Sequence, residues 1–144
     1  MKLYHGSRIQ GLKIINPSKN NYDTEVKNNK VYASIDKRFA ACFGAKWDYN
    51  CADLGSWDNY KTLIFGITNF VNLNQPCSLY DVECDNFIPL NQKEFISKEP
   101  VKVIKEIKYN SFKDMLLNND VKIVTHEEYR SNIFNTNPEF HYLF

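Results

Sequence analysis

The feature that most constrains the fold is a succession of short β-type segments that runs from about residue 62 to residue 109. These segments are rich in Val, Ile, Phe and Tyr, and they are separated by Asn, Gly, Pro and Asp, as is typical of strands joined by turns. In order they read TLIFGITNF, SLYDVE, KEFIS and VKVIKEIKY; LYHGS, GLKIINP and KVYAS precede them, and VKIVT follows. The sequence therefore predicts that strands are the main elements.

Two helices are predicted among these strands. Asp36 is a candidate N-cap for KRFAACFGA, and Ser111 is a candidate N-cap for FKDMLLNN. Residues 18–29 and 47–60 are expected to be loops, and the tail from His126 to Phe144 is expected to be a helix followed by a docked terminus. No repeat, low-complexity block or linker interrupts the 144 residues, so residues 1–144 are predicted to form a single α+β domain.

Charge and hydropathy narrow the classes of partner. The formal net charge of +1 gives no electrostatic reason to expect nucleic-acid binding, although a local basic patch stays open. No apolar run approaches ~20 residues, and the start of the chain lacks the apolar segment of a signal peptide. We therefore expect a soluble cytoplasmic protein without a membrane partner.

The four cysteines are Cys42, Cys51, Cys77 and Cys84. None forms a C-x-x-C pair, and no histidine lies at metal-ligand spacing from them. They are expected to be free thiols in a reducing compartment, and no metal site is predicted. The alternative of a thiol nucleophile has no support from the neighbouring residues.

Three segments carry a possible chemistry. Histidine is scarce, yet LYHGS places His5 on the first predicted strand. VYASIDKRFAACF places Tyr32 on another strand with Phe43 in the following helix, and KEFIS places Glu94 at the head of a later strand. This order of His, Tyr and Glu resembles the catalytic set of the ADP-ribosyltransferase superfamily, in the branch of the diphtheria-type toxins and the poly-ADP-ribose polymerases.

The resemblance implies a split, mostly antiparallel sheet with an NAD cleft between its halves. It also implies that NAD is a substrate, that His5, Tyr32 and Glu94 are catalytic, and that no metal takes part. The NAD-binding residues that it implies are His5, Gly6, Ser7, Tyr32 and Phe43.

Elementary chemistry gives these residues compatible roles. Nicotinamide leaves NAD as a neutral molecule, so a single carboxylate such as Glu94 is enough to stabilise the positive charge that develops on the ribose. Aromatic faces stack on a cationic ring, which suits Tyr32 and Phe43. Gly6 would let its backbone reach the carboxamide, and His5 would hold a ribose hydroxyl.

Each residue also has a structural alternative. His5 is also compatible with an ordinary histidine on a strand, Tyr32 and Phe43 with core residues, and Glu94 with a solvated surface charge. Four other acidic residues compete with Glu94 for the catalytic role: Asp81, Glu83, Asp85 and Glu99. The sequence also departs from the polymerase pattern, because Ala40 stands where a serine would help to hold the carboxamide.

The predicted function is mono-ADP-ribosyl transfer from NAD to an acceptor that the sequence does not identify. A protein, a nucleic acid and a small molecule such as a rifamycin all stay open as acceptor, and a role as toxin, phage or defence factor is a hypothesis. One alternative is an RNA 2′-phosphotransferase of the same fold, which expects a basic patch with several arginines where this chain has three. A second alternative is a non-catalytic module that binds NAD or a protein partner.

Overall fold

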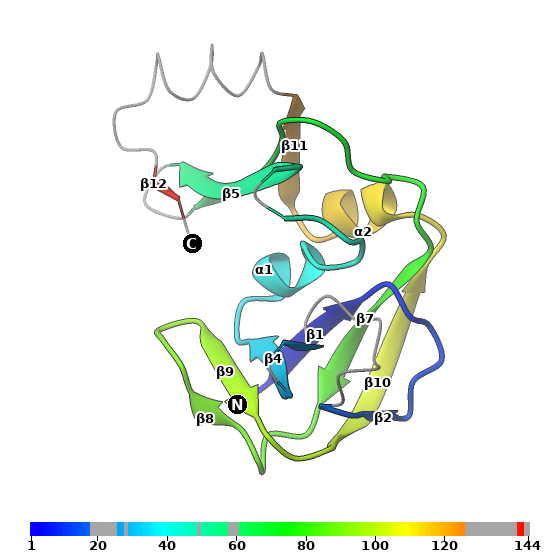
Figure 1. The fold of residues 1–144 in the computed structure, drawn as a ribbon, viewed down its shortest axis with the longest axis vertical. Coiled ribbons are helices and arrows are strands. Elements are labelled where there is room, and N and C mark those ends of the chain that lie inside the picture. Colours follow the sequence, from blue (N-terminus) through cyan, green and yellow to red (C-terminus); the bar gives the residue numbers. More distant parts are fainter. Residues whose placement is uncertain (18–25, 28, 49, 58–60, 126–140, 143–144) are drawn as a thin grey trace.

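The chain forms two β-sheets with two short helices between them, as Figure 1 shows for this computed structural model. The structure describes residues 1–144 except 18–25, 28, 49, 58–60, 126–140 and 143–144. Among the described pairs of strands, every pair is antiparallel apart from β6 and β11. The prediction of an α+β fold with a mostly antiparallel sheet is therefore confirmed.

The larger sheet has eight strands, seven of them in the order β2-β10-β7-β1-β4-β9-β8, with β3 paired to β4 off this path. Its elements are β1 (Leu3–Ser7), β2 (Ile14–Ile15), β3 (Val26–Lys27), β4 (Lys30–Ser34), β7 (Cys77–Val82), β8 (Ile88–Pro89), β9 (Glu94–Ser97) and β10 (Val101–Tyr109).

The smaller sheet has the order β11-β6-β5-β12. Its strands are β5 (Ala52–Trp57), β6 (Thr62–Ile67), β11 (Val121–Thr125) and β12 (His141–Tyr142), and the helices between the two sheets are α1 (Lys37–Ala41) and α2 (Phe112–Asn118). Within the described residues, no helix is both long and apolar enough to cross a membrane.

Local sequence explains both helix starts. The Asp36 side chain accepts a hydrogen bond from the Arg38 N–H, and the Ser111 side chain accepts one from the Asp114 N–H. Both residues have extended backbone, which is the usual geometry of an N-cap. Both predicted caps are therefore confirmed.

The first helix is shorter than its sequence predicts. Helix propensity extends to residue 45, but α1 ends at Ala41, with Cys42 as its C-cap. Beyond it the Cys42 and Phe43 N–H groups bond to the carbonyls of Phe39 and Ala40, three residues back, so the helix closes with a tight last turn. Gly44, which has low helix propensity, follows two residues after the C-cap.

Three strands are not evident from the sequence. The prediction of a loop over residues 47–60 is wrong, because β5 pairs with β6 over six residue pairs from Ala52 to Trp57. Its sequence, ADLGSW, shows little β propensity, so the strand depends on its pairing with β6 for stability. The predicted loop over residues 18–29 is wrong at Val26–Lys27, which form β3 and pair with β4. The strand β8 also has only two residues, and most of the predicted tail lies outside the described residues.

The larger sheet buries apolar side chains on both faces. The face toward the helices shares a core with the smaller sheet, to which Phe39, Leu79, Phe65 and Phe112 contribute. The opposite face has its own core, which consists of Leu3, Ile15, Val31, Ala33, Tyr80, Val82 and Val101. We call these the helix face and the outer face of the larger sheet.

The packing of α1 on β1 generates the first prediction. A Cβ atom on Gly6 would lie 2.0 Å from the carbonyl oxygen of Ala40, which is a backbone atom that cannot rotate away. Gly6→Ala should therefore lower the free energy of unfolding by about 1–3 kcal/mol or more, because the helix must shift to relieve the overlap.

Urea unfolding followed by circular dichroism measures this effect. The matched control is Ser7→Ala in the same strand, which removes one side-chain hydrogen bond without introducing a clash. A Gly6→Ala protein as stable as the wild type would show that α1 does not rest on β1 in this way.

Candidate functional site

His5 is fully buried on β1 and links this strand to β4. Its Nδ1 atom lies 2.7 Å from the carbonyl oxygen of Tyr32. Since a carbonyl oxygen only accepts hydrogen bonds, Nδ1 is the protonated ring nitrogen. The ring also lies near Tyr80 on the outer face, with 6.4 Å between the two ring centroids.

The strands β1 and β4 separate close to this histidine. Their described ladder consists of the pair Tyr4–Ser34, whereas β1 pairs with β7 along its whole length from Leu3 to Ser7. The hydrogen bond from His5 to the Tyr32 carbonyl therefore joins the two strands just beyond the end of their ladder.

The three residues predicted to be catalytic lie on three neighbouring strands. Next to β1, β4 pairs with β9 over four residue pairs, among them Tyr32–Ile96 and Ser34–Glu94. The fold thus brings together segments that are far apart in sequence, with His5 on β1, Tyr32 on β4 and Glu94 on β9.

The register divides these residues between the two faces of the sheet. Side chains alternate along a strand, and residues that pair directly share a face. Tyr32 and Glu94 therefore lie on the helix face with Gly6, whereas His5 lies on the outer face. The three residues thus lie on neighbouring strands, but His5 and Glu94 point to opposite faces of the sheet.

A tight turn before β9 holds Glu94. The Asn91 Oδ1 atom accepts a hydrogen bond from the Glu94 N–H at 2.8 Å, and Asn91 Nδ2 donates to Glu94 Oε1 at 3.0 Å. Glu94 is half-buried. The Glu94 carboxylate is thus held in a defined position at the start of β9, and part of the side chain is open to solvent.

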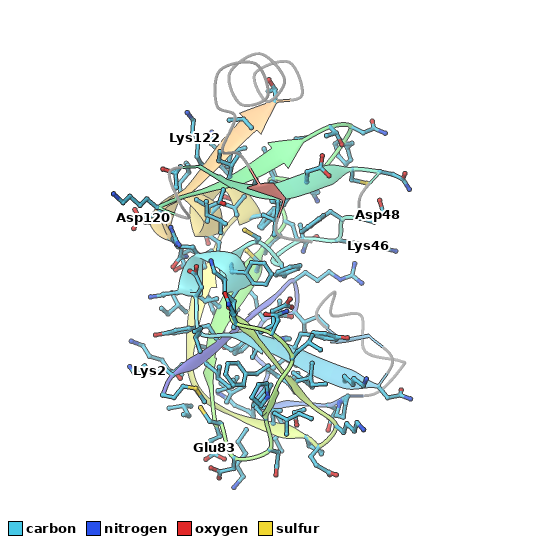
Figure 2. All side chains as sticks on the ribbon, turned by 90° about the vertical axis from the view of Figure 1, so that its left-hand side faces the viewer. Lys2, Lys46, Asp48, Glu83, Asp120 and Lys122 are labelled. Carbon is cyan, nitrogen blue, oxygen red and sulfur yellow. The ribbon has the colours of Figure 1, made fainter. Side chains whose placement is uncertain are left out.

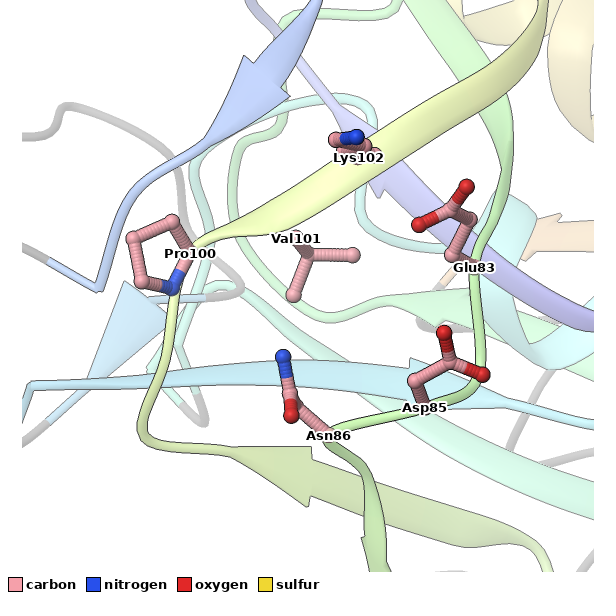
Figure 3. A pocket seen from close by; sticks show the side chains of 6 residues that line it. All are labelled: Glu83, Asp85, Asn86, Pro100, Val101 and Lys102. Atoms are coloured by element: carbon pink, nitrogen blue, oxygen red, sulfur yellow. The ribbon is translucent and has the colours of Figure 1, made fainter.

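The competing acidic residues have different surroundings. Glu99 is exposed, and its backbone is held by hydrogen bonds with the Ser97 hydroxyl. Asp81 lies 3.8 Å from the ammonium group of Lys2. Glu83 and Asp85 line a cavity of about 120 Å³ together with Asn86 and Lys102, and Figure 3 shows their side chains around it.

Gly6 and Ser7 have clear structural roles. The Ala40 carbonyl occupies the space where a side chain on Gly6 would lie, so a ligand could reach Gly6 only along its backbone edge. The Ser7 hydroxyl is buried and accepts a hydrogen bond from the Ile9 N–H at 2.9 Å, which shapes the turn after β1. Their predicted contacts with NAD stay predictions.

Phe43 belongs to the core in this structure. It lies two residues beyond the end of α1 rather than inside the helix, and only 8% of its surface is exposed. Its ring stacks on Trp47 at 5.5 Å between centroids and meets Phe39 edge-on at 5.3 Å. One ring face is thus occupied by a protein side chain, and a stacking role toward nicotinamide stays a prediction.

A charged group beside Glu94 is not evident from the sequence. Arg38 Nη2 lies 3.0 Å and Lys93 Nζ lies 3.1 Å from Asp36 Oδ2. Burial alone would raise the pKa of Asp36, but hydrogen bonds from Arg38 and Lys93 outweigh it and lower the pKa from 3.8 to about 2. The sequence indicates only the cap, because residues 36 and 93 are remote in the chain.

A polar cluster on the outer face is likewise absent from the sequence predictions. Tyr80 is fully buried; its hydroxyl donates to the Ile9 carbonyl at 2.6 Å and accepts from the Leu12 N–H at 3.1 Å. Glu106 Oε2 accepts from the Gly11 N–H at 2.8 Å and from the Ser78 hydroxyl at 2.6 Å. The cluster anchors the segment that follows the His5 strand.

The titration of this cluster fits an anchoring role. Burial raises the pKa of Tyr80 to about 12, so the hydroxyl stays protonated and keeps donating. Burial disfavours the charged form of Glu106, but hydrogen bonds from Gly11 and Ser78 outweigh it and lower its pKa. The sequence gives one indication of this cluster, which is the alternation of polar and apolar residues in SLYD and IKEIK.

Neither a metal site nor a reactive thiol is expected in the described part of the chain. No group of three or more His, Cys, Asp or Glu residues there is arranged to hold a metal ion. All four cysteines are free thiols, and burial raises the pKa of Cys77 to about 12.

Comparisons with known proteins add no relative. No protein-family model matches the chain, and neither a curated protein nor a solved structure matches it.

The Asp36 cluster generates a prediction about pH. The folded-state pKa lies below the ordinary value, so the stabilisation is present above pH 3.8 and disappears as the pH falls toward 2. Asp36→Asn retains a good N-cap residue but removes the charge, and should cost on the order of 1–2 kcal/mol at neutral pH.

Thermal unfolding between pH 7 and pH 2 tests this expectation, and the difference between wild type and variant should shrink toward the acid end. The control is Asp48→Asn, since Asp48 is an exposed aspartate that also accepts a backbone N–H. A constant difference between Asp36→Asn and wild type at every pH would contradict the assigned cause.

Proposed function

We propose that this chain is an NAD-dependent mono-ADP-ribosyltransferase. The observation that carries the proposal is the placement of His5, Tyr32 and Glu94 on three neighbouring strands, at the point where β1 and β4 separate. The order of these residues and their strand context support the proposal, together with the resemblance of the sequence to the ADP-ribosyltransferase superfamily.

The proposed reaction breaks the bond between C1′ of the ribose and the nicotinamide nitrogen. The bonding electrons leave with nicotinamide, which becomes neutral, and the ribose acquires oxocarbenium character. A nucleophile of the acceptor then attacks C1′ and loses its proton. When water is the nucleophile, the products are free ADP-ribose, nicotinamide and a proton.

Glu94 is the proposed catalytic carboxylate. Its fixed position at the head of β9 would let a negative charge face the ribose as positive charge develops there. The same carboxylate could accept the proton of the acceptor nucleophile, because part of its surface stays open to solvent.

Binding of NAD is proposed at the separation of β1 and β4. Because Gly6, Tyr32 and Glu94 share the helix face, the dinucleotide would lie on that face. Nicotinamide would meet Gly6 along its backbone edge and Tyr32 by stacking, with Ser7 near by. The predicted contact of His5 with a ribose has no open path in this structure, because His5 is fully buried on the outer face; it would act as a positioning residue through its hydrogen bond to the Tyr32 carbonyl.

The decisive variant is Glu94→Gln. It retains the size and most of the hydrogen bonding of the side chain but removes the charge, which matters only as the glycosidic bond breaks. We expect nicotinamide release to slow by about 10²–10³ while NAD affinity stays close to that of the wild type.

The assay measures nicotinamide release with water as acceptor, alongside calorimetric titration with NAD. Glu99→Gln is the control, because Glu99 is exposed and lies five residues along the same segment. Near wild-type turnover in Glu94→Gln would remove this residue from the mechanism. If the wild type binds NAD without releasing nicotinamide, the non-catalytic alternative is favoured.

Stacking by Tyr32 gives a separate prediction. Tyr32→Ala should weaken NAD binding by about 0.5–1.5 kcal/mol beyond the effect of the smaller buried area, whereas Tyr32→Phe should bind almost as the wild type does. NAD titration of both variants, with a melting curve for each, separates an effect on stacking from an effect on folding. Equal NAD affinity in wild type and a folded Tyr32→Ala protein would exclude the stacking role.

A further inference from the structure

A small basic pocket lies on the helix face of the larger sheet. Its volume is about 90 Å³, and its charged lining consists of Lys2, Lys37, Lys105 and Asp81, with Tyr4 between them. Three ammonium groups and one carboxylate give the pocket a net positive formal charge. Leu79 and Ile107 form the apolar part of the lining.

The sheet register builds this pocket. Tyr4 on β1 pairs with Asp81 on β7, and Asp81 pairs with Lys105 on β10, so the three side chains share one face in a row. Lys37 reaches the row from α1, with its Nζ atom 5.9 Å from the centre of the Tyr4 ring. The lysines are therefore gathered by strands and a helix that are remote in the sequence.

The single carboxylate leaves most of the positive charge available to a ligand. Lys2 Nζ lies 3.8 Å from Asp81 Oδ2, but the Lys2 side chain is 73% exposed, and such a pair is weak. Among the described residues, Lys37 and Lys105 have no carboxylate within ion-pair distance. Figure 2 shows Lys2 at the larger sheet and Lys122 at the smaller one.

The same row continues to the proposed catalytic carboxylate. Tyr4 pairs with Ser34, and Ser34 pairs with Glu94, so all three lie on the helix face. Two strand spacings separate Tyr4 from Glu94, which corresponds to about 10 Å. Lys105 on β10 lies four strand spacings from Glu94, so a group bound between the lysines would lie on the same face as the proposed catalytic carboxylate, about 10–20 Å from it.

We infer that this pocket binds a phosphate group of a nucleotide acceptor, with Tyr4 offering a ring to the adjacent base. Lysine ammonium groups bind phosphate as point charges, and aromatic rings beside basic residues stack bases with little sequence preference. This inference rests on the proposed function, because it names the class of acceptor for the transfer at Glu94.

Binding of a fluorescent 12-nucleotide single-stranded DNA, followed by anisotropy without NAD, tests the pocket. Lys37→Gln combined with Lys105→Gln should weaken binding by about tenfold or more and reduce the slope of log K against log salt by about 0.7 for each phosphate that the variant no longer binds. The matched control combines Lys46→Gln with Lys122→Gln, two exposed lysines outside the pocket. Asp81→Asn should strengthen binding, since it removes the one acidic group of the lining.

Two further ligands define the source of the phosphate. Competition by AMP as effective per phosphate as the oligonucleotide would indicate a free nucleotide, and much weaker competition would indicate a polynucleotide; both outcomes retain the inference. An absence of oligonucleotide binding, an equal weakening in the control variant, or tighter binding of a polyglutamate peptide would overturn it.

These experiments can contradict the phosphate-binding inference and the proposed transferase function independently of each other. Glu94→Gln should bind the oligonucleotide as the wild type does while its nicotinamide release is slowed. A protein that releases nicotinamide but does not bind the oligonucleotide retains the transferase proposal alone. A protein that binds the oligonucleotide without releasing nicotinamide is a nucleotide-binding protein and not the proposed enzyme.

Discussion

The close approach of α1 to β1 at Gly6 is the contact on which the rest of the arrangement depends. With no side chain at Gly6, the Ala40 carbonyl rests against the strand, and the helix joins the larger sheet to the core shared with the smaller one. The same contact sets where Asp36, the N-cap of α1, lies, and Asp36 in turn binds Lys93 beside Glu94. The absence of a side chain at Gly6 thus allows the contacts that connect β1, α1 and the start of β9.

Polar contacts on the two faces of the larger sheet have different roles. On the outer face, Tyr80 and Glu106 fix the segment after β1, and His5 bonds to the Tyr32 carbonyl where β1 leaves β4. These groups are buried or paired, which suits a rigid support. On the helix face, the row through Tyr4 and Glu94 retains charges that are open to solvent, which suits contact with a substrate.

The sequence predicts the local features of this protein better than its long-range contacts. The strands KVYAS, VKVIKEIKY and VKIVT and the caps Asp36 and Ser111 are predictable because their signals lie within a few residues. The strand β5 is not predictable, because its stability comes from β6. The predicted helix through Phe43 is too long, because the Cys42 and Phe43 N–H groups already close the last turn on Phe39 and Ala40. The Asp36–Lys93 pair and the lysine pocket depend on strand register, which no local pattern encodes.

The edges of the larger sheet have a consequence for the behaviour of the protein at high concentration. Both outer strands, β2 and β8, have only two residues; β8 contains Pro89, and Pro17 follows β2 by two positions. A proline has no N–H to offer to an incoming strand, and a two-residue edge presents few free backbone groups. The strands β2 and β8 themselves therefore offer little template for the addition of further chains, and β10, which pairs with β2 only at Val101 and Lys102, presents the longer edge.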